Sequence, residues 1–115
     1  MIYAAPNQAN SKINFKPQYQ NFIGGKWTAP VQGEYFDNIS PINGKKFCEI
    51  PRSTADDIEL ALDAAHAAKD SWGKTSVAER SNTLLRIADR LEQNLETLAV
   101  AETWDNGKSI RETLA

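Results

Sequence analysis

The sequence has very little of the residues that most often carry catalysis, metal binding or disulfide bonds. Its 115 residues include one cysteine, Cys48, and one histidine, His66. A single cysteine cannot form an internal disulfide, and one Cys with one His cannot supply the four ligands of a structural zinc site. The opening residues 1–10 have neither a basic start nor a long apolar stretch. We therefore expect no secretory signal and a cytoplasmic protein.

Concentrated positive charge and long apolar runs are also missing. Thirteen Lys and Arg residues stand against fifteen Asp and Glu residues, which gives a formal net charge of −2. Nucleic-acid binding depends on clustered Lys and Arg side chains that face phosphates, so we expect no nucleic-acid partner. No apolar run approaches the roughly 20 residues that span a bilayer, so we expect no membrane partner.

The first half of the chain has the pattern of a short arm followed by two β-hairpins. Residues 1–18 are polar and contain two prolines, which predicts a flexible N-terminal arm. Aromatic and β-branched residues flank the pair Gly24-Gly25, and glycine tolerates the positive φ of a tight hairpin turn. A second hairpin is predicted from Tyr35–Ile39 and Lys45–Ile50, joined by a turn that contains Pro41 and Gly44.

The second half changes to helical spacing. Apolar residues recur every three or four positions over 55–72, and a second stripe follows a capping-box pattern at Ser76 and Glu79. A break is expected near Asn94, a third helix over 95–104, and a stop at Asn106-Gly107. Another capping-box pattern, Ser109 with Glu112, predicts a fourth helix that the end of the chain interrupts. The chain is therefore predicted to be α+β, with two N-terminal β-hairpins followed by three to four α-helices.

The residues that invite a catalytic interpretation have simpler explanations. His66 lies between alanines to one side of an apolar stripe, which favours a surface or boundary position. Cys48 lies in a predicted strand without a partner nearby in sequence, which favours a buried, inert thiol. Gly24-Gly25 is too short for a phosphate-binding loop. The tryptophans fall in or beside packing stripes, which favours a core or an interface: Trp27, Trp72 and Trp104. We assign no catalytic and no cofactor-binding residue within this chain.

Five segments in order resemble the NAD(P)-dependent aldehyde dehydrogenases. The segment 21–27, Asn-Phe-Ile-Gly-Gly-Lys-Trp, resembles the family's opening hairpin, and 39–45 resembles its NP-x-x-G turn, with Ser40 where Asn is more usual. The helix 55–72 is similar to the family's first helix, and 78–91 is similar to the next. The segment 102–108 matches E-T-x-D-N-G-K, with Trp104 where Leu is commoner. Within the family, the motifs are most similar to those of bacterial enzymes that act on acetaldehyde and similar aliphatic aldehydes.

The resemblance implies a parent protein several times longer, with an α/β, aldehyde dehydrogenase-like fold. Residues 19–115 would be the N-terminal part of its cofactor-binding domain, truncated at the C-terminal end. The parent would oxidise a small aldehyde to a carboxylic acid with NAD(P)+ through a thiohemiacetal and hydride transfer. In the family, the nucleotide-binding loop and catalytic residues come later in the chain. The expected partners are the remainder of the chain and further copies in a homo-oligomer; no cofactor is expected in this chain alone.

Two further expectations follow. The family often holds a structural monovalent cation with backbone carbonyls near the NP turn and with the Asp of D-N-G-K. These positions correspond here to Ile39 and Asp105, and the resemblance implies that the remaining ligand comes from later chain. A turn beside Asn106-Gly107 also explains Asp105. The alternative function is a stand-alone helical protein-interaction module without enzymatic activity. In either case we expect the stripes that contain Leu84, Ile87 and Leu91, and Ile58 with Leu62, to be partly uncovered and the isolated chain to self-associate.

Overall fold

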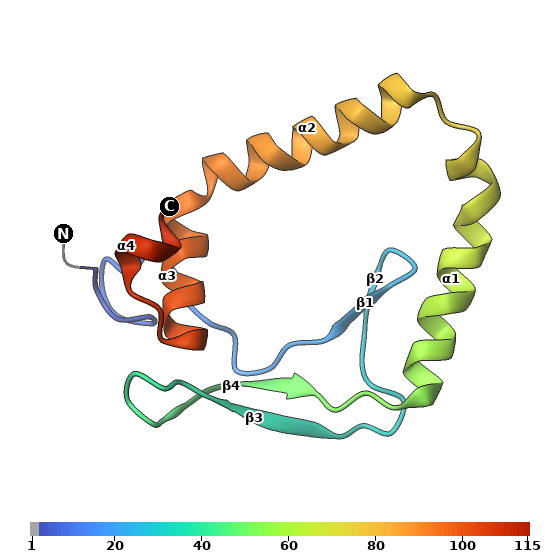
Figure 1. Ribbon diagram of the computed structural model, residues 1–115. Coiled ribbons are helices and arrows are strands. Elements are labelled where there is room, and N and C mark those ends of the chain that lie inside the picture. Colours follow the sequence, from blue (N-terminus) through green and yellow to red (C-terminus); the bar gives the residue numbers. More distant parts are fainter. Residues whose placement is uncertain (1–2) are drawn as a thin grey trace.

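The computed structural model describes residues 3–115 as two small antiparallel sheets followed by helices (Figure 1). The strands are β1 (Asn21–Ile23), β2 (Lys26–Thr28), β3 (Tyr35–Ile39) and β4 (Lys46–Pro51). The helices are α1 (Ala55–Gly73), α2 (Val77–Gln93), α3 (Leu95–Asn106) and α4 (Ile110–Thr113). The predicted fold class and element order are therefore confirmed.

The two hairpins form where the turn residues predict them. In the first, Phe22 is opposite Trp27, and the turn between them places Gly24 and Gly25 at φ values of 61° and 79°. These positive values are the conformation that favours glycine over residues with a Cβ. In the second hairpin, Tyr35 is opposite Pro51, and an irregularity between Asn38 and Ile39 shifts the register.

The predicted capping chemistry is present at the start of α2 but not at the start of α4. The Ser76 side chain accepts a hydrogen bond from the Glu79 amide, and the Glu79 carboxylate accepts one from the Ser76 amide at 2.8 Å, which is the predicted capping box. Asn94 separates α2 from α3, as expected. The capping box predicted at Ser109 is wrong, because the Ser109 side chain makes no capping hydrogen bond; the Ser109 carbonyl accepts the backbone bonds of the turn instead.

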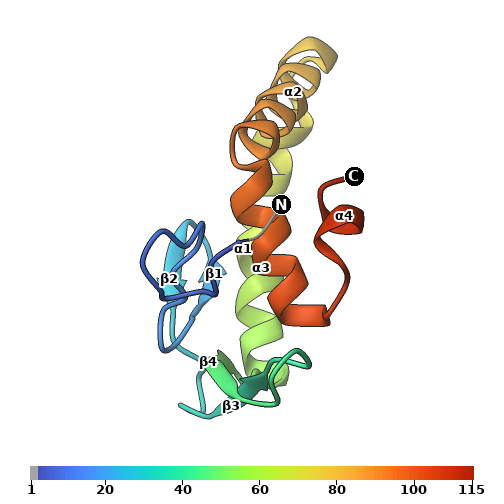
Figure 2. The same ribbon diagram turned by 90° about the vertical axis from the view of Figure 1, so that its left-hand side faces the viewer.

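The elements enclose an open frame rather than a filled core. Helices α1, α2 and α3 and the β3–β4 hairpin form its sides, and the β1–β2 hairpin lies inside it beside α1 (Figure 1). Seen edge-on, the frame is thin, with α4 on one side and the β1–β2 hairpin on the other (Figure 2). The radius of gyration is 17.5 Å, whereas a compact domain of this size has about 13 Å. Few side chains are therefore covered.

The exposed apolar side chains confirm the prediction of uncovered stripes. Leu84 is 67% exposed and Ile58 is 56% exposed, although both lie on the apolar faces of their helices. Trp27 and Trp72 are 70% and 50% exposed, so they do not form a core among residues 3–115. None of the helices described in residues 3–115 is long and apolar enough to cross a membrane.

Candidate functional site

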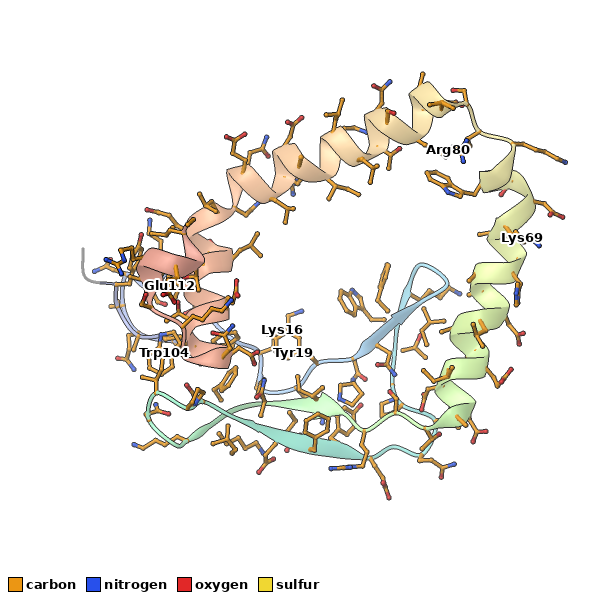
Figure 3. All side chains as sticks on the ribbon, viewed as in Figure 1. Lys16, Tyr19, Lys69, Arg80, Trp104 and Glu112 are labelled. Carbon is orange, nitrogen blue, oxygen red and sulfur yellow. The ribbon has the colours of Figure 1, made fainter. Side chains whose placement is uncertain are left out.

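The best-packed part of the molecule joins the end of β3 to the end of α3, and we call it the β3–α3 junction (residues 38–41, Cys48, and residues 99–107). The Ser40 hydroxyl is fully buried and donates a hydrogen bond of 2.7 Å to the Trp104 carbonyl oxygen. The Asn38 side-chain amide donates one of 2.8 Å to Oδ1 of Asp105. Figure 3 shows Trp104 at the end of α3, next to the β3–β4 hairpin. These two bonds connect parts of the chain more than 60 residues apart.

A glycine lets the two segments approach each other closely. Gly107 ends α3 with φ of 79°, and its amide donates to the Thr103 carbonyl oxygen. A Cβ at this position would lie 3.1 Å from Cγ of Pro41. Both the left-handed backbone and the contact with Pro41 therefore require glycine here.

Cys48, the residue of the junction that β4 contributes, is buried, with 3% of its surface exposed. Its burial raises the pKa of the thiol, the nearby charge of Asp105 raises it further, and hydrogen bonding with Asn38 opposes the rise. A thiol with a raised pKa forms little thiolate, which is the nucleophilic species. The prediction of a buried, unreactive Cys48 is confirmed in its burial and supported by this electrostatic environment.

The junction brings the segments of the two predicted cation ligands together. Ile39 lies between Asn38 and Ser40, whose side chains bond to Asp105 and to the carbonyl of Trp104. Asp105 is exposed and keeps its second carboxylate oxygen available, because the Asn38 amide bonds only to Oδ1. Oxygen donors of this kind suit a hard cation, but Ile39 and Asp105 supply fewer ligands than the six to eight that such ions commonly take. The site as a whole stays a prediction.

The other candidate residues are dispersed. His66 is exposed on α1, which confirms the predicted surface position, whereas Cys48 is buried in β4. No group of three or more His, Cys, Asp or Glu side chains among residues 3–115 has the arrangement to hold a metal ion. The contacts of the β3–α3 junction therefore hold distant segments of the chain together.

Sequence reasoning missed two roles that only the folded chain makes visible. Ser40 was singled out as an unusual residue in the turn, but nothing in the sequence indicated its bond to Trp104. Asp57, in the first turn of α1, is 2% exposed and accepts a 2.9 Å hydrogen bond from the Val31 amide. It thereby fastens the loop before β3 to the start of α1.

The N-terminal arm has contacts of its own. The Lys12 ammonium lies 2.6 Å from the Glu96 carboxylate, and the Tyr3 hydroxyl donates to the same group at 3.3 Å. The Thr97 hydroxyl donates to the Lys12 carbonyl oxygen at 3.2 Å. These contacts place the arm against the first turn of α3.

Comparison with known proteins defines the class of protein to which the β3–α3 junction and the two hairpins belong. The model of the aldehyde dehydrogenase family matches residues 27–115. The chain therefore belongs to the aldehyde dehydrogenase family, which confirms the resemblance read from its motifs.

Individual relatives make the similarity more specific. A long-chain-aldehyde dehydrogenase of an Acinetobacter species is 70% identical over 115 residues, which is 100% of this chain and 23% of that protein. An acetaldehyde dehydrogenase of Pseudomonas aeruginosa is 66% identical over 114 residues, which is 99% of this chain and 22% of that protein. The chain thus spans less than a quarter of the length of these relatives.

Solved structures agree with the fold. The indole-3-acetaldehyde dehydrogenase of P. syringae, in complex with NAD+ and IAA, has a TM-score of 0.84 at 40% identity, covering 89% of this chain and 21% of that one. An NAD-dependent aldehyde dehydrogenase from Sinorhizobium meliloti has a TM-score of 0.81 at 31% identity, covering 97% of this chain and 23% of that one. The open frame is therefore the arrangement that these segments adopt within longer chains.

Proposed function

We propose that this chain is the N-terminal portion of an enzyme that oxidises an aldehyde to a carboxylic acid with NAD(P)+. The observation that carries the proposal is the 70% identity to a long-chain-aldehyde dehydrogenase across the whole of this chain. The structural relative in complex with NAD+ supports the cofactor. The chemistry that the cofactor supplies is acceptance of a hydride from the substrate carbon.

We assign this chain the role of scaffold. Its residues offer no phosphate-binding loop, since Gly24 and Gly25 form the β1–β2 turn. The dinucleotide does not fit the residues present here, and we assign its binding, together with the catalytic residues, to later polypeptide. In this proposal residues 1–18 are an arm and residues 19–115 belong to the cofactor-binding domain. The exposed faces of α1 and α2 would then pack on that later polypeptide.

Within this scaffold, we also propose that Ile39 and Asp105 contribute to a structural monovalent cation site. The support is the pair of hydrogen bonds that hold their segments together at the β3–α3 junction. The thermal midpoint of the complete protein should be higher in KCl or NaCl than in tetramethylammonium chloride at equal ionic strength. Asp105→Asn should remove most of that difference, and an unchanged difference would contradict the assignment.

The test of the enzymatic proposal compares two proteins. The complete protein should produce NADH from NAD+ in the presence of an aldehyde, and a series from acetaldehyde to long-chain aldehydes would define its substrate range. The 115-residue chain should be inactive under the same conditions. If the chain alone reduced NAD+ with acetaldehyde at a rate that Cys48→Ser abolished, the scaffold assignment would be wrong.

The remaining properties of the complete enzyme belong to the same proposal. We place it in the cytoplasm as a homo-oligomer that acts on a small aliphatic aldehyde. The acetaldehyde dehydrogenase of Pseudomonas aeruginosa, at 66% identity, supports the small substrate. The alternative of a stand-alone interaction module is not favoured, because the relatives that match this chain are aldehyde dehydrogenases along its full length.

A further inference from the structure

Helices α1 and α2 carry large apolar side chains that the other elements of residues 3–115 leave largely exposed. On α1, Ile58, Leu62 and Trp72 are 56%, 46% and 50% exposed. On α2, the exposed fractions are 73% for Val77, 67% for Leu84, 51% for Ile87 and 53% for Leu91. The β1–β2 hairpin reaches α1 at Ala64, whose Cβ lies 3.8 Å from the Cβ position of Gly24, and leaves these side chains exposed.

The apolar positions of the two helices lie at equal distances, counted in residues, from the connection that joins the helices. Counted outward from Trp72 and Val77, the positions reached by steps of three and four residues in turn are apolar on both helices except at Lys69 and Arg80. Residues at equal distance from the connection therefore form layers: Trp72 with Val77, Ala65 with Leu84, Leu62 with Ile87, and Ile58 with Leu91. Alternating steps of three and four are the spacing with which two helices pack along one seam.

We propose that α1 and α2 close on each other as an antiparallel αα-hairpin when the later polypeptide is absent. The connection between Gly73 and Val77 contains three residues, which is within the two to five that join antiparallel helices in such hairpins. Closure buries the four apolar layers and turns the open frame into a flat, compact body.

Closure involves the rest of the frame as well. The β3–α3 junction forms the corner opposite the α1–α2 connection (Figure 1), and the β1–β2 hairpin projects to one side of the frame (Figure 2), so closure requires the other corners to bend while the hairpin stays on that side. One layer opposes closure, because it would bring two positively charged residues together. Lys69 and Arg80 are also equidistant from the connection, and Figure 3 shows them on α1 and α2. Their hydrocarbon stems can pack while both charges reach solvent.

This inference concerns the 115-residue chain and does not rest on the enzymatic activity. In the proposed enzyme the same faces would be covered by later polypeptide, so the closed hairpin is a form that protects them before that polypeptide is present. The seven side chains are otherwise exposed apolar surface of the kind that promotes aggregation.

Disulfide cross-linking tests the seam directly. In a Cys48→Ala background, the pair Leu62→Cys and Ile87→Cys should form a disulfide within one chain in a glutathione redox buffer. The matched pair Leu60→Cys and Asp89→Cys is also equidistant from the connection but lies two positions away on each helix, on the opposite face. We expect cross-linking of the first pair to exceed that of the second at least about tenfold, because closure raises the effective concentration of the thiols.

The outcomes separate the alternatives. Equal cross-linking of the two pairs would overturn the proposal. Cross-linking of the first pair only between chains in a dimer, which is the result that the self-association expected from the sequence would give, would also overturn it. Circular dichroism of each variant establishes that the helices are retained.

X-ray scattering of the unaltered chain gives a second test that needs no cysteine. A closed monomer should have a radius of gyration clearly below the 17.5 Å of the open frame. Ile87→Asp, which places a charge in the seam, should return the value to that of the open frame. Leu85→Asp, at a 62% exposed position off the seam, should not. A monomer of the unaltered chain with a radius of 17.5 Å or more would overturn the proposal.

Discussion

The β3–α3 junction and the α1–α2 arm (residues 55–93) differ in how much of their surface the chain itself covers. At the junction Ser40 is fully buried and Val100 is 2% exposed. On the arm Leu84 and Val77 are 67% and 73% exposed, although the arm contains the two longest helices. Regular secondary structure and burial are therefore independent in this chain. A helix needs only its own sequence pattern, whereas a core needs partners from elsewhere.

A second difference is the range over which each region is held together. The junction is joined by hydrogen bonds between residues more than 60 positions apart. The arm is held mainly at its beginning, where Asp57 bonds to the Val31 amide. Disruption of the junction should therefore cost stability, whereas the same change on the arm should cost little. Three matched pairs of variants and one variant at the start of the arm examine this contrast.

The largest effect is expected from a buried charge at the junction. Val100→Asp should lower the free energy of unfolding by about 3 kcal/mol or more, because an unpaired carboxylate would be buried. Leu85→Asp also introduces a carboxylate, at a 62% exposed position on α2 outside the proposed α1–α2 seam, and should change the free energy of unfolding by less than about 0.5 kcal/mol. Urea unfolding followed by tryptophan fluorescence measures both. Equal losses would mean that the arm is as well packed as the junction.

A glycine pair gives the next largest difference. Gly107→Ala should destabilise the chain by about 1–2 kcal/mol, because alanine disfavours the left-handed conformation, and the new Cβ would lie 3.1 Å from Cγ of Pro41. At Gly73, which has no positive φ and no atom within 4 Å of a new Cβ, the same change should be neutral or slightly stabilising. The midpoints of thermal unfolding of the two variants measure this difference. If Gly107→Ala left the midpoint unchanged, the close approach of Gly107 to Pro41 would be contradicted.

Removing one hydroxyl should have a smaller effect. Ser40→Ala leaves the Trp104 carbonyl without its 2.7 Å donor in a buried position and should cost about 1–2 kcal/mol. Ser71→Ala removes a hydroxyl that donates to the Ala68 carbonyl on the exposed surface of α1 and should change stability by less than about 0.5 kcal/mol. If both variants unfolded at the same urea concentration, the long-range bond would contribute nothing.

The smallest effect is a dependence on acid at the start of the arm. The amides of Thr54 and Val31 donate to the charged Asp57 carboxylate and lower its pKa. Because the unfolded chain has the ordinary, higher pKa, the ionised carboxylate stabilises the fold above that value, and the contribution is lost as pH falls below about 4. Unfolding midpoints measured between neutral and acidic pH should show less acid dependence for Asp57→Asn. An unchanged dependence would assign the acid sensitivity to other groups.

Most of the local structure could be predicted from the sequence. Gly24-Gly25 predicted the first hairpin turn, Ser76 with Glu79 predicted a helix start, and Gly107 predicted a helix stop. Each depends on chemistry within a few residues. The same reasoning failed at Ser109, where backbone hydrogen bonds hold the turn and the serine side chain makes no capping bond.

The site was less predictable. Motif resemblance identified Ile39 and Asp105 as positions of interest, and the structure brings their segments together. The residues that make the contact, Asn38 and Ser40, were not predicted as partners of α3. Their role depends on which distant backbone atoms lie within hydrogen-bonding reach, and no local spacing encodes that.

The sequence by itself determined the strands, the helices, their order and the family to which the chain belongs, because these depend on short-range patterns and on motifs in series. The tertiary structure alone decided which distant residues meet. It buried Ser40 against the Trp104 carbonyl, and it confirmed the expected burial of Cys48 and the expected exposure of the stripes on α1 and α2. The physical reason is that apolar spacing gives a helix a face to bury, whereas burial requires a second surface opposite that face.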